Sequence, residues 1–190
     1  MSASEPARRL PDVRVGSTPD ALSPVSFAER SIAAGLRQWS ALAAVVAAAV
    51  AADQVTKHVV AGHLQLGERV GVAGPFSIHR IQNSGIAFGL FGSATSIVIF
   101  ATSIAVIWMV VYFARSGGRH PVLPVGLGLV LGGAVSNLVD RARLGHVTDF
   151  LDIGPWPAFN LADSFIVIGV GVLVATLVAV DRPGRPPSRP

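Results

Sequence analysis

Four long apolar stretches constrain what this chain can fold into more than any other feature. They lie at 39–60, 93–114, 121–139 and 159–180. Each approaches or exceeds the roughly 20 apolar residues that a helix needs to cross the hydrocarbon core of a bilayer. With 51% of its residues hydrophobic and only 14% charged, the chain has a composition typical of membrane proteins. The sequence therefore predicts an α-helical integral membrane protein with four transmembrane helices.

The basic residues are almost all arginine, and their distribution gives an orientation. If the four spans alternate in direction, one side of the membrane receives Arg8, Arg9, Arg14, Arg30, Arg37, Arg115, Arg119, Arg182, Arg185 and Arg189. The other side receives only Lys57, Arg69, Arg80, Arg141 and Arg143. Because lysine and arginine concentrate in cytoplasmic segments, both termini are predicted to be cytoplasmic. The positive charge is thereby explained without nucleic acid, and no nucleic-acid partner is expected.

The segments outside the spans differ from one another. Residues 1–36 and 182–190 mix Pro, Ser and Arg without periodicity, so they are predicted to be disordered tails around a membrane domain at 37–181. Residues 61–92 contain a partly alternating run and a Gly-Pro pair, which predict a small strand-and-turn element, whereas 142–158 is predicted to be a short loop. An alternative treats "ALAAVVAAAVAAD" as a cleavable secretory signal, but the polar segment before it is too long for that.

The chain contains no cysteine, which excludes disulfides, thiolate catalysis and Cys-ligated metals. Its five histidines show no metal-ligand spacing, so they are expected at the surface or the membrane interface. No metal and no cofactor are predicted, and any nucleophile must be oxygen.

Carboxylates near the spans are the candidates for chemistry, because a charge at bilayer depth costs about 2.5 to 3.5 kcal/mol. Under the predicted topology they gather at the outer side: Asp53, Asp140, Asp149, Asp152 and Asp163. Asn137 and Asn160 each precede an aspartate by three residues and so share a helix face with it. Two carboxyl groups brought together in a semi-dry site cannot both stay ionised, so one acts as acid and one as base. Such a pair can activate a water molecule against an amide carbonyl.

Each of these residues also has a structural interpretation. Asp163 can favour the helix dipole with Asn160 as a cap, and Asp152 can be a solvated loop residue. Two further pairs are possible structural ion pairs: Asp140 with Arg141, and Asp53 with Lys57. The stretch "NSGIAFG" can be a simple turn.

Two other functions, proton-coupled transport and proteolysis by a serine, predict different sequence features. A proton-coupled transporter would distribute polar residues through the depth of the bilayer, whereas the charges here cluster on one side and the second span has none. A serine intramembrane protease would need a partner for its serine, but the chain has a single lysine and no G-x-S-x-G.

Five motifs in order resemble a known family, the lipoprotein signal peptidases or signal peptidase II, which are bacterial inner-membrane aspartic proteases. The motifs are "DQVTK" at 53–57, "NSGIAFG" at 83–89, "GGAVSNLVDR" at 132–141, "GHVTDF" at 145–150 and "FNLADS" at 159–164. The chain departs from the family's usual residues at Ile86, Ser136 and Thr148.

The resemblance implies a four-helix membrane fold with a small extracytoplasmic β-sheet cradle and an active site near the extracytoplasmic face of the inner membrane. It implies a catalytic dyad of Asp149 and Asp163. The supporting and substrate-binding positions implied are Asp53, Lys57, Asn83, Gly85, Asn137, Asp140, Arg141, Asn160 and Ala162. The implied partners are the phospholipid bilayer and diacylglyceryl-modified prolipoproteins, cleaved on the amino side of the lipidated cysteine by a monomeric enzyme.

Overall fold

The computed structural model describes residues 34–85, 95–118 and 120–180. Residues 1–33 and 182–190 of the predicted tails and residues 86–89 of "NSGIAFG" lie outside these ranges, whereas Leu36, which was predicted to end the first tail, begins the first helix. The helices are α1 (Leu36–His63), α2 (Thr95–Ser116), α3 (Leu123–Leu144) and α4 (Leu161–Val180). The strands are β1 (Arg69–Ala73), β2 (Phe76–Asn83) and β3 (Val147–Ile153).

The four helices are each long and apolar enough to cross a membrane, which confirms the predicted fold class. Their ends differ from the predicted spans in two places that matter for the site. Helix α3 continues to Leu144, so that Asp140 and Arg141 lie within the helix. Helix α4 begins at Leu161, which makes Asp163 the third residue of its first turn.

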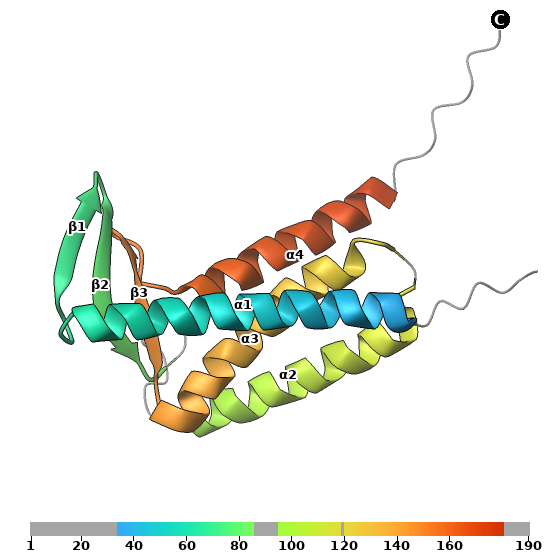
Figure 1. Ribbon diagram of the computed structural model, residues 1–190, viewed down its shortest axis with the longest axis horizontal. Coiled ribbons are helices and arrows are strands. Elements are labelled where there is room, and N and C mark those ends of the chain that lie inside the picture. Colours follow the sequence, from blue (N-terminus) through green and yellow to red (C-terminus); the bar gives the residue numbers. More distant parts are fainter. Residues whose placement is uncertain (1–33, 86–94, 119, 181–190) are drawn as a thin grey trace, which may run out of the picture. The chain divides into compact units, whose positions relative to one another are not determined.

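Helix α3 is the central helix of the bundle (Figure 1). In its apolar window 56% of residues are buried, against 11% to 17% in the windows of the other three helices. Glycines permit this position: a Cβ added at Gly132 would lie 2.6 Å from the Cβ of Ala49 on α1. A Cβ added at Gly133 would lie 2.3 Å from the carbonyl oxygen of Ala162 on α4. The backbones of α1 and α4 therefore approach α3 more closely than any residue with a side chain would allow.

A three-stranded antiparallel sheet, in the order β1-β2-β3, lies where α1 ends and α4 begins (Figure 1). The predicted strand-and-turn element corresponds to β1 and β2, but the prediction of a plain loop at 142–158 was wrong, because β3 lies there. The residues of β3 are almost all buried, including two aspartates, so the alternation that marks a half-exposed strand is absent from its sequence.

The segment before α4 folds back onto β3. The main-chain N–H groups of Phe150 and Leu151 donate to the carbonyl of Phe159, at 3.0 and 2.8 Å, and the N–H of Phe159 donates to the carbonyl of Leu151 at 2.9 Å. These bonds fix the chain just before α4 against the strand that carries Asp149. They therefore bring the start of α4, with Asp163, close to Asp149.

The expectation that Asp152 is a solvated loop residue was also wrong. Asp152 lies on β3 with 4% of its surface exposed. Its carboxylate accepts hydrogen bonds from Arg69 on β1 and, at 3.1 Å, from Nδ1 of His79 on β2. The bond from Arg69 holds the pKa of Asp152 below its usual range. Asp152 thus connects the three strands to one another. Its hydrogen bonds go to Arg69 and His79 and not to the residues predicted for catalysis.

Candidate active site

Asp149 is a buried carboxylate on β3, with 3% of its surface exposed. Its two oxygens accept hydrogen bonds from amide side chains, Oδ2 from Asn83 at 3.0 Å and Oδ1 from Asn160 at 2.7 Å. Burial, together with the negative charge of nearby Asp163, raises the pKa of Asp149 from 3.8 to about 6, although the hydrogen bonds from Asn83 and Asn160 oppose the shift. This carboxyl group can therefore exchange a proton near neutral pH.

Asp163 lies in the first turn of α4 and is held from both sides. Its Oδ2 accepts the main-chain N–H of Asn160 at 3.3 Å, and the Oδ1 of Asn160 accepts the N–H of Asp163 at 3.0 Å. This reciprocal pair is a capping box, so the capping interpretation of these two residues is correct as geometry. The second oxygen, Oδ1, accepts a bond from Asn137 on α3 at 2.8 Å. Asp163 also lines two adjoining pockets, so capping does not occupy it fully.

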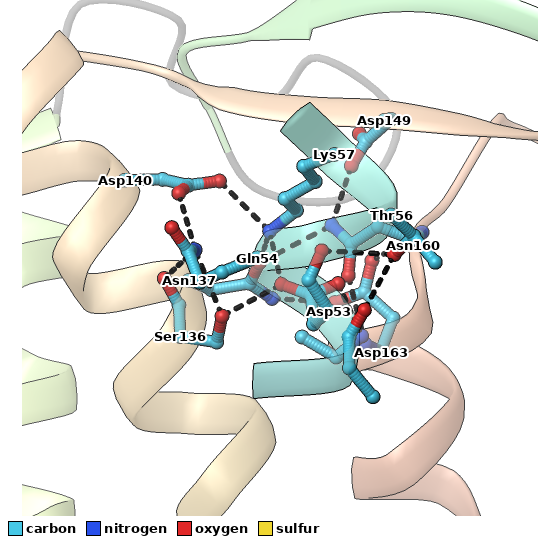
Figure 2. Close-up of polar contacts among 12 residues, drawn as sticks. Asp53, Gln54, Thr56, Lys57, Ser136, Asn137, Asp140, Asp149, Asn160 and Asp163 are labelled. Carbon is cyan, nitrogen blue, oxygen red and sulfur yellow. Dashed lines mark hydrogen bonds and ion pairs between the residues drawn. The ribbon is translucent and has the colours of Figure 1, made fainter. Parts of the chain in front are cut away.

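Asn160 links the two carboxyl groups (Figure 2). It is fully buried, and its Nδ2 donates to Asp149 at 2.7 Å and to the Oδ1 of Asn137 at 3.2 Å. Among the described residues no hydrogen bond joins Asp149 directly to Asp163, and neither forms a salt bridge. The pair is therefore held by hydrogen bonds from side-chain and main-chain amides, and not by salt bridges among the described residues.

A second group of buried charges centres on Lys57. Its Nζ lies 2.7 Å from Oδ2 of Asp53 and 2.8 Å from Oδ2 of Asp140. The same ammonium group donates to Asn137 at 3.0 Å. Asp53 and Lys57 thus form the pair expected from their spacing. The alternative that Asp140 pairs with Arg141 was wrong, because the partners of Asp140 are Lys57 and, at 2.7 Å, Gln54.

The remaining predicted residues join the two groups into one hydrogen-bonded network. Gly85 donates through its N–H to Asn83 at 3.0 Å, and its carbonyl accepts a bond from Arg141 at 3.1 Å. The main-chain N–H of Ala162 donates to Oδ1 of Asp53 at 2.9 Å. Every residue predicted for the site is connected to the others through these contacts.

Two residues of this network, Gln54 and Ser136, were not predicted as site residues. Gln54 donates to Ser136 at 2.9 Å and to Asp140, and Ser136 donates to Asp53 at 2.7 Å. The sequence held one signal for Ser136, since it precedes Asp140 by four residues and so shares its helix face.

A pocket of about 460 Å³ gives both carboxylates access to a substrate. It is lined by Asn83, Val98, Thr102, Ala134, Asn137, Arg141, Val147, Asp149, Trp156, Pro157, Ala158, Phe159, Asp163, Ile166 and Val167. These residues come from α2, α3, α4, the sheet and the segment that connects β3 to α4, so the pocket lies between apolar helix faces and the polar residues of β2 and β3. A second, more apolar pocket of about 590 Å³ shares Trp156, Phe159, Asp163 and Val167 with it. Both carboxylates thus border the first pocket, and Asp163 borders the second as well.

The chain is similar to known proteins over most of its length. The family model for signal peptidase (SPase) II matches residues 45–179. A lipoprotein signal peptidase of Symbiobacterium thermophilum is 40% identical over 142 residues, which cover 72% of this chain and 93% of that protein. A lipoprotein signal peptidase of Pelotomaculum thermopropionicum is 42% identical over 135 residues, which cover 70% and 89%.

Solved structures agree with the sequence relatives. A bacterial membrane enzyme solved by the in meso method at 2.3 Å resolution superposes with a TM-score of 0.71 and 27% identity, covering 78% of this chain and 94% of that one. A second such enzyme, solved at 1.9 Å resolution, gives a TM-score of 0.67 and 30% identity, covering 72% and 92%. With this fold, and with the family model spanning the whole network described above, the chain belongs to the signal peptidase II family, the lipoprotein signal peptidases.

Proposed function

We propose that this membrane protease is an aspartic endopeptidase in which Asp149 and Asp163 form the catalytic pair. The observation that carries the proposal is the arrangement of these two carboxyl groups, which border one pocket, are connected through Asn160 and form no salt bridge with any described residue. Family membership supports a hydrolase over the transporter alternative. The clustering of carboxylates favours them over a serine nucleophile.

In the proposed mechanism the pair shares one proton. The ionised carboxylate removes a proton from a water molecule, whose oxygen attacks the scissile carbonyl carbon, while the protonated carboxyl group donates its proton to the carbonyl oxygen. The tetrahedral diol then collapses: the carboxyl group that took the water proton gives it to the amine nitrogen as the C–N bond breaks. A diol hydroxyl returns its proton to the other carboxylate, which restores the singly protonated pair. Water is the only co-reactant.

The proposed substrates are diacylglyceryl-modified prolipoproteins, cleaved on the amino side of the lipidated cysteine. The relatives named lipoprotein signal peptidases support this substrate class. The pocket supports it as well, because its apolar lining from α2 and α4 suits a substrate that remains anchored in the bilayer. We further propose that both termini are cytoplasmic and that the site lies near the extracytoplasmic face, as the distribution of arginines predicts. We also propose that the enzyme is a monomer.

Cleavage of a purified lipidated precursor by the wild-type protein, Asp149→Asn and Asp163→Asn tests the proposal. Each variant keeps the size of the side chain but cannot exchange the proton, so both are expected to bind precursor and to release no signal peptide. Ser103→Ala is a suitable control, since its hydroxyl donates only within α2, to the carbonyl of Ile99. Full activity in either aspartate variant would rule out the catalytic pair.

A further inference from the structure

Ser136 and Gln54 occupy the interior between α1 and α3, where they join two buried carboxylates. Ser136 is fully buried, and Gln54 is half-buried. Asp53 lies at one end of the connection and Asp140 at the other (Figure 2). The catalytic proposal assigns no function to either of the two uncharged residues.

The direction of these hydrogen bonds is fixed by the chemistry of the groups. The Nε2 of Gln54 can only donate, and it does so to Oδ1 of Asp140 at 2.7 Å and to Oγ of Ser136 at 2.9 Å. The Ser136 hydroxyl has a single hydrogen, which it donates to Oδ2 of Asp53 at 2.7 Å. The chain of donors therefore runs one way, from Gln54 through Ser136 to the carboxylate of Asp53.

Asp53 passes this connection on to α4. Its other oxygen, Oδ1, accepts the main-chain N–H of Ala162 at 2.9 Å, one of the N–H groups in the first turn that have no partner within their own helix. Ala162 directly precedes Asp163. Because the carbonyl of Ala162 also packs against Gly133, where even a Cβ would not fit, a movement of this turn cannot be absorbed locally. A displaced Asp53 carboxylate would therefore shift the residue that carries the Asp163 side chain.

We propose that Ser136 and Gln54 are positioning residues for Asp163. Together with Lys57, which binds the same oxygen of Asp53, they hold this carboxylate in the orientation that binds Ala162. They thereby help to fix the first turn of α4 and the direction of the Asp163 carboxyl group. This inference rests on the proposed catalytic role of Asp163. A positioning role differs from a packing role in two ways. It requires the hydrogen bonds of Ser136 and Gln54 themselves, and their loss lowers the rate of the chemical step.

The experiment compares Ser136→Ala, Gln54→Met and the double variant with the wild-type protein in cleavage of a purified diacylglyceryl-modified precursor. We expect each single variant to lower kcat roughly ten-fold without changing KM. Since both residues belong to one chain of bonds, the double variant should be no slower than the slower single variant. Ser136→Cys keeps a weaker donor of similar size and should recover part of the rate. Ser103→Ala is the matched control and should retain wild-type kcat.

Wild-type kcat in Ser136→Ala and Gln54→Met overturns the inference, as does a loss confined to KM or a double variant whose losses multiply. Should Ser136→Ala fail to fold in detergent, kcat of Gln54→Met and Ser136→Cys decides the question. Asp163→Asn is measured in parallel. If it is inactive while Ser136→Ala has wild-type kcat, only the positioning role fails, whereas activity of Asp163→Asn contradicts the catalytic proposal itself.

Discussion

Two groups of carboxylates, all buried except the partly buried Asp163, meet where the sheet joins the helices, and they differ in how their charge is balanced. Asp53 and Asp140 share the ammonium group of Lys57, at 2.7 and 2.8 Å. Asp149 and Asp163 receive hydrogen bonds from amide groups and border a pocket. A cation between two carboxylates offsets part of their combined charge and fixes their geometry, whereas amide donors hold a carboxylate in place and leave it free to exchange protons. The same side-chain chemistry therefore serves structure in one group and, as we propose, catalysis in the other.

The largest expected effect contrasts one aspartate from each group. Asp149→Asn should lower kcat for cleavage of a lipidated precursor by roughly 10³-fold, the scale of losing a general acid or base. Asp140→Asn should retain a measurable fraction of the rate, because Asp140 contacts Lys57 and Gln54 and not the pocket that holds the pair. Initial rates of both variants, normalised to folded protein, measure the contrast. An Asp140→Asn variant as inactive as Asp149→Asn would erase the distinction between the groups.

Removing the cation should affect stability more than any single change in the amide-bound group. Lys57→Met leaves Asp53 and Asp140 buried without their shared partner, and loss of one member of a buried ion pair costs about 3 to 5 kcal/mol. The unfolding free energy in detergent micelles, measured by denaturant titration, tests this value. The double variant Lys57→Met/Asp140→Asn should recover part of the loss, since one of the two unpaired charges is then gone. No recovery would mean that Lys57 contributes mainly through packing.

The pH dependence of stability distinguishes the groups in a third way. The pKa of Asp149 is raised by burial from 3.8 to about 6, so the folded state binds the proton more tightly than the unfolded chain does. Its stabilising contribution is complete below pH 3.8 and is lost as pH rises through about 6, a change on the order of 3 kcal/mol. The unfolding free energy of the wild-type protein should therefore fall relative to that of Asp149→Asn between pH 4 and pH 7. A constant difference over this range would contradict a buried carboxyl group that exchanges its proton.

The smallest effect is expected for a cation that reaches solvent. Arg69 pairs with Asp152 on the sheet, but 52% of its side chain is exposed. Exposed ion pairs contribute under about 1 kcal/mol, so Arg69→Gln should lower the unfolding free energy by less than that and leave kcat unchanged. His79 keeps Asp152 partnered in this variant. A loss comparable to that of Lys57→Met would show that burial is not what separates the two cations.

The sequence alone determined the membrane fold and indicated most of the polar residues that the structure brings together, with Gln54 and Ser136 as the exceptions. Four apolar spans require helices, because backbone polar groups in a bilayer must be satisfied within the segment. Asn160 and Asp163 could be placed on one helix face from their spacing, and the capping box follows from that local geometry. These features depend on contacts between residues a few positions apart, and the helical spacing of residues in the sequence predicts such contacts directly.

Only the tertiary structure decided which charges meet. Asp140 is followed in sequence by Arg141 but pairs with Lys57, 83 positions before it on α1, because α1 packs closely against the glycines of α3. Strand β3 escaped prediction because both its faces are buried, and its pairing with Phe159 is what brings Asp149 to the start of α4. Contacts between distant segments depend on how whole elements pack, which local sequence patterns do not encode. In this protein those contacts decide which carboxylates are paired with Lys57 and which can exchange a proton.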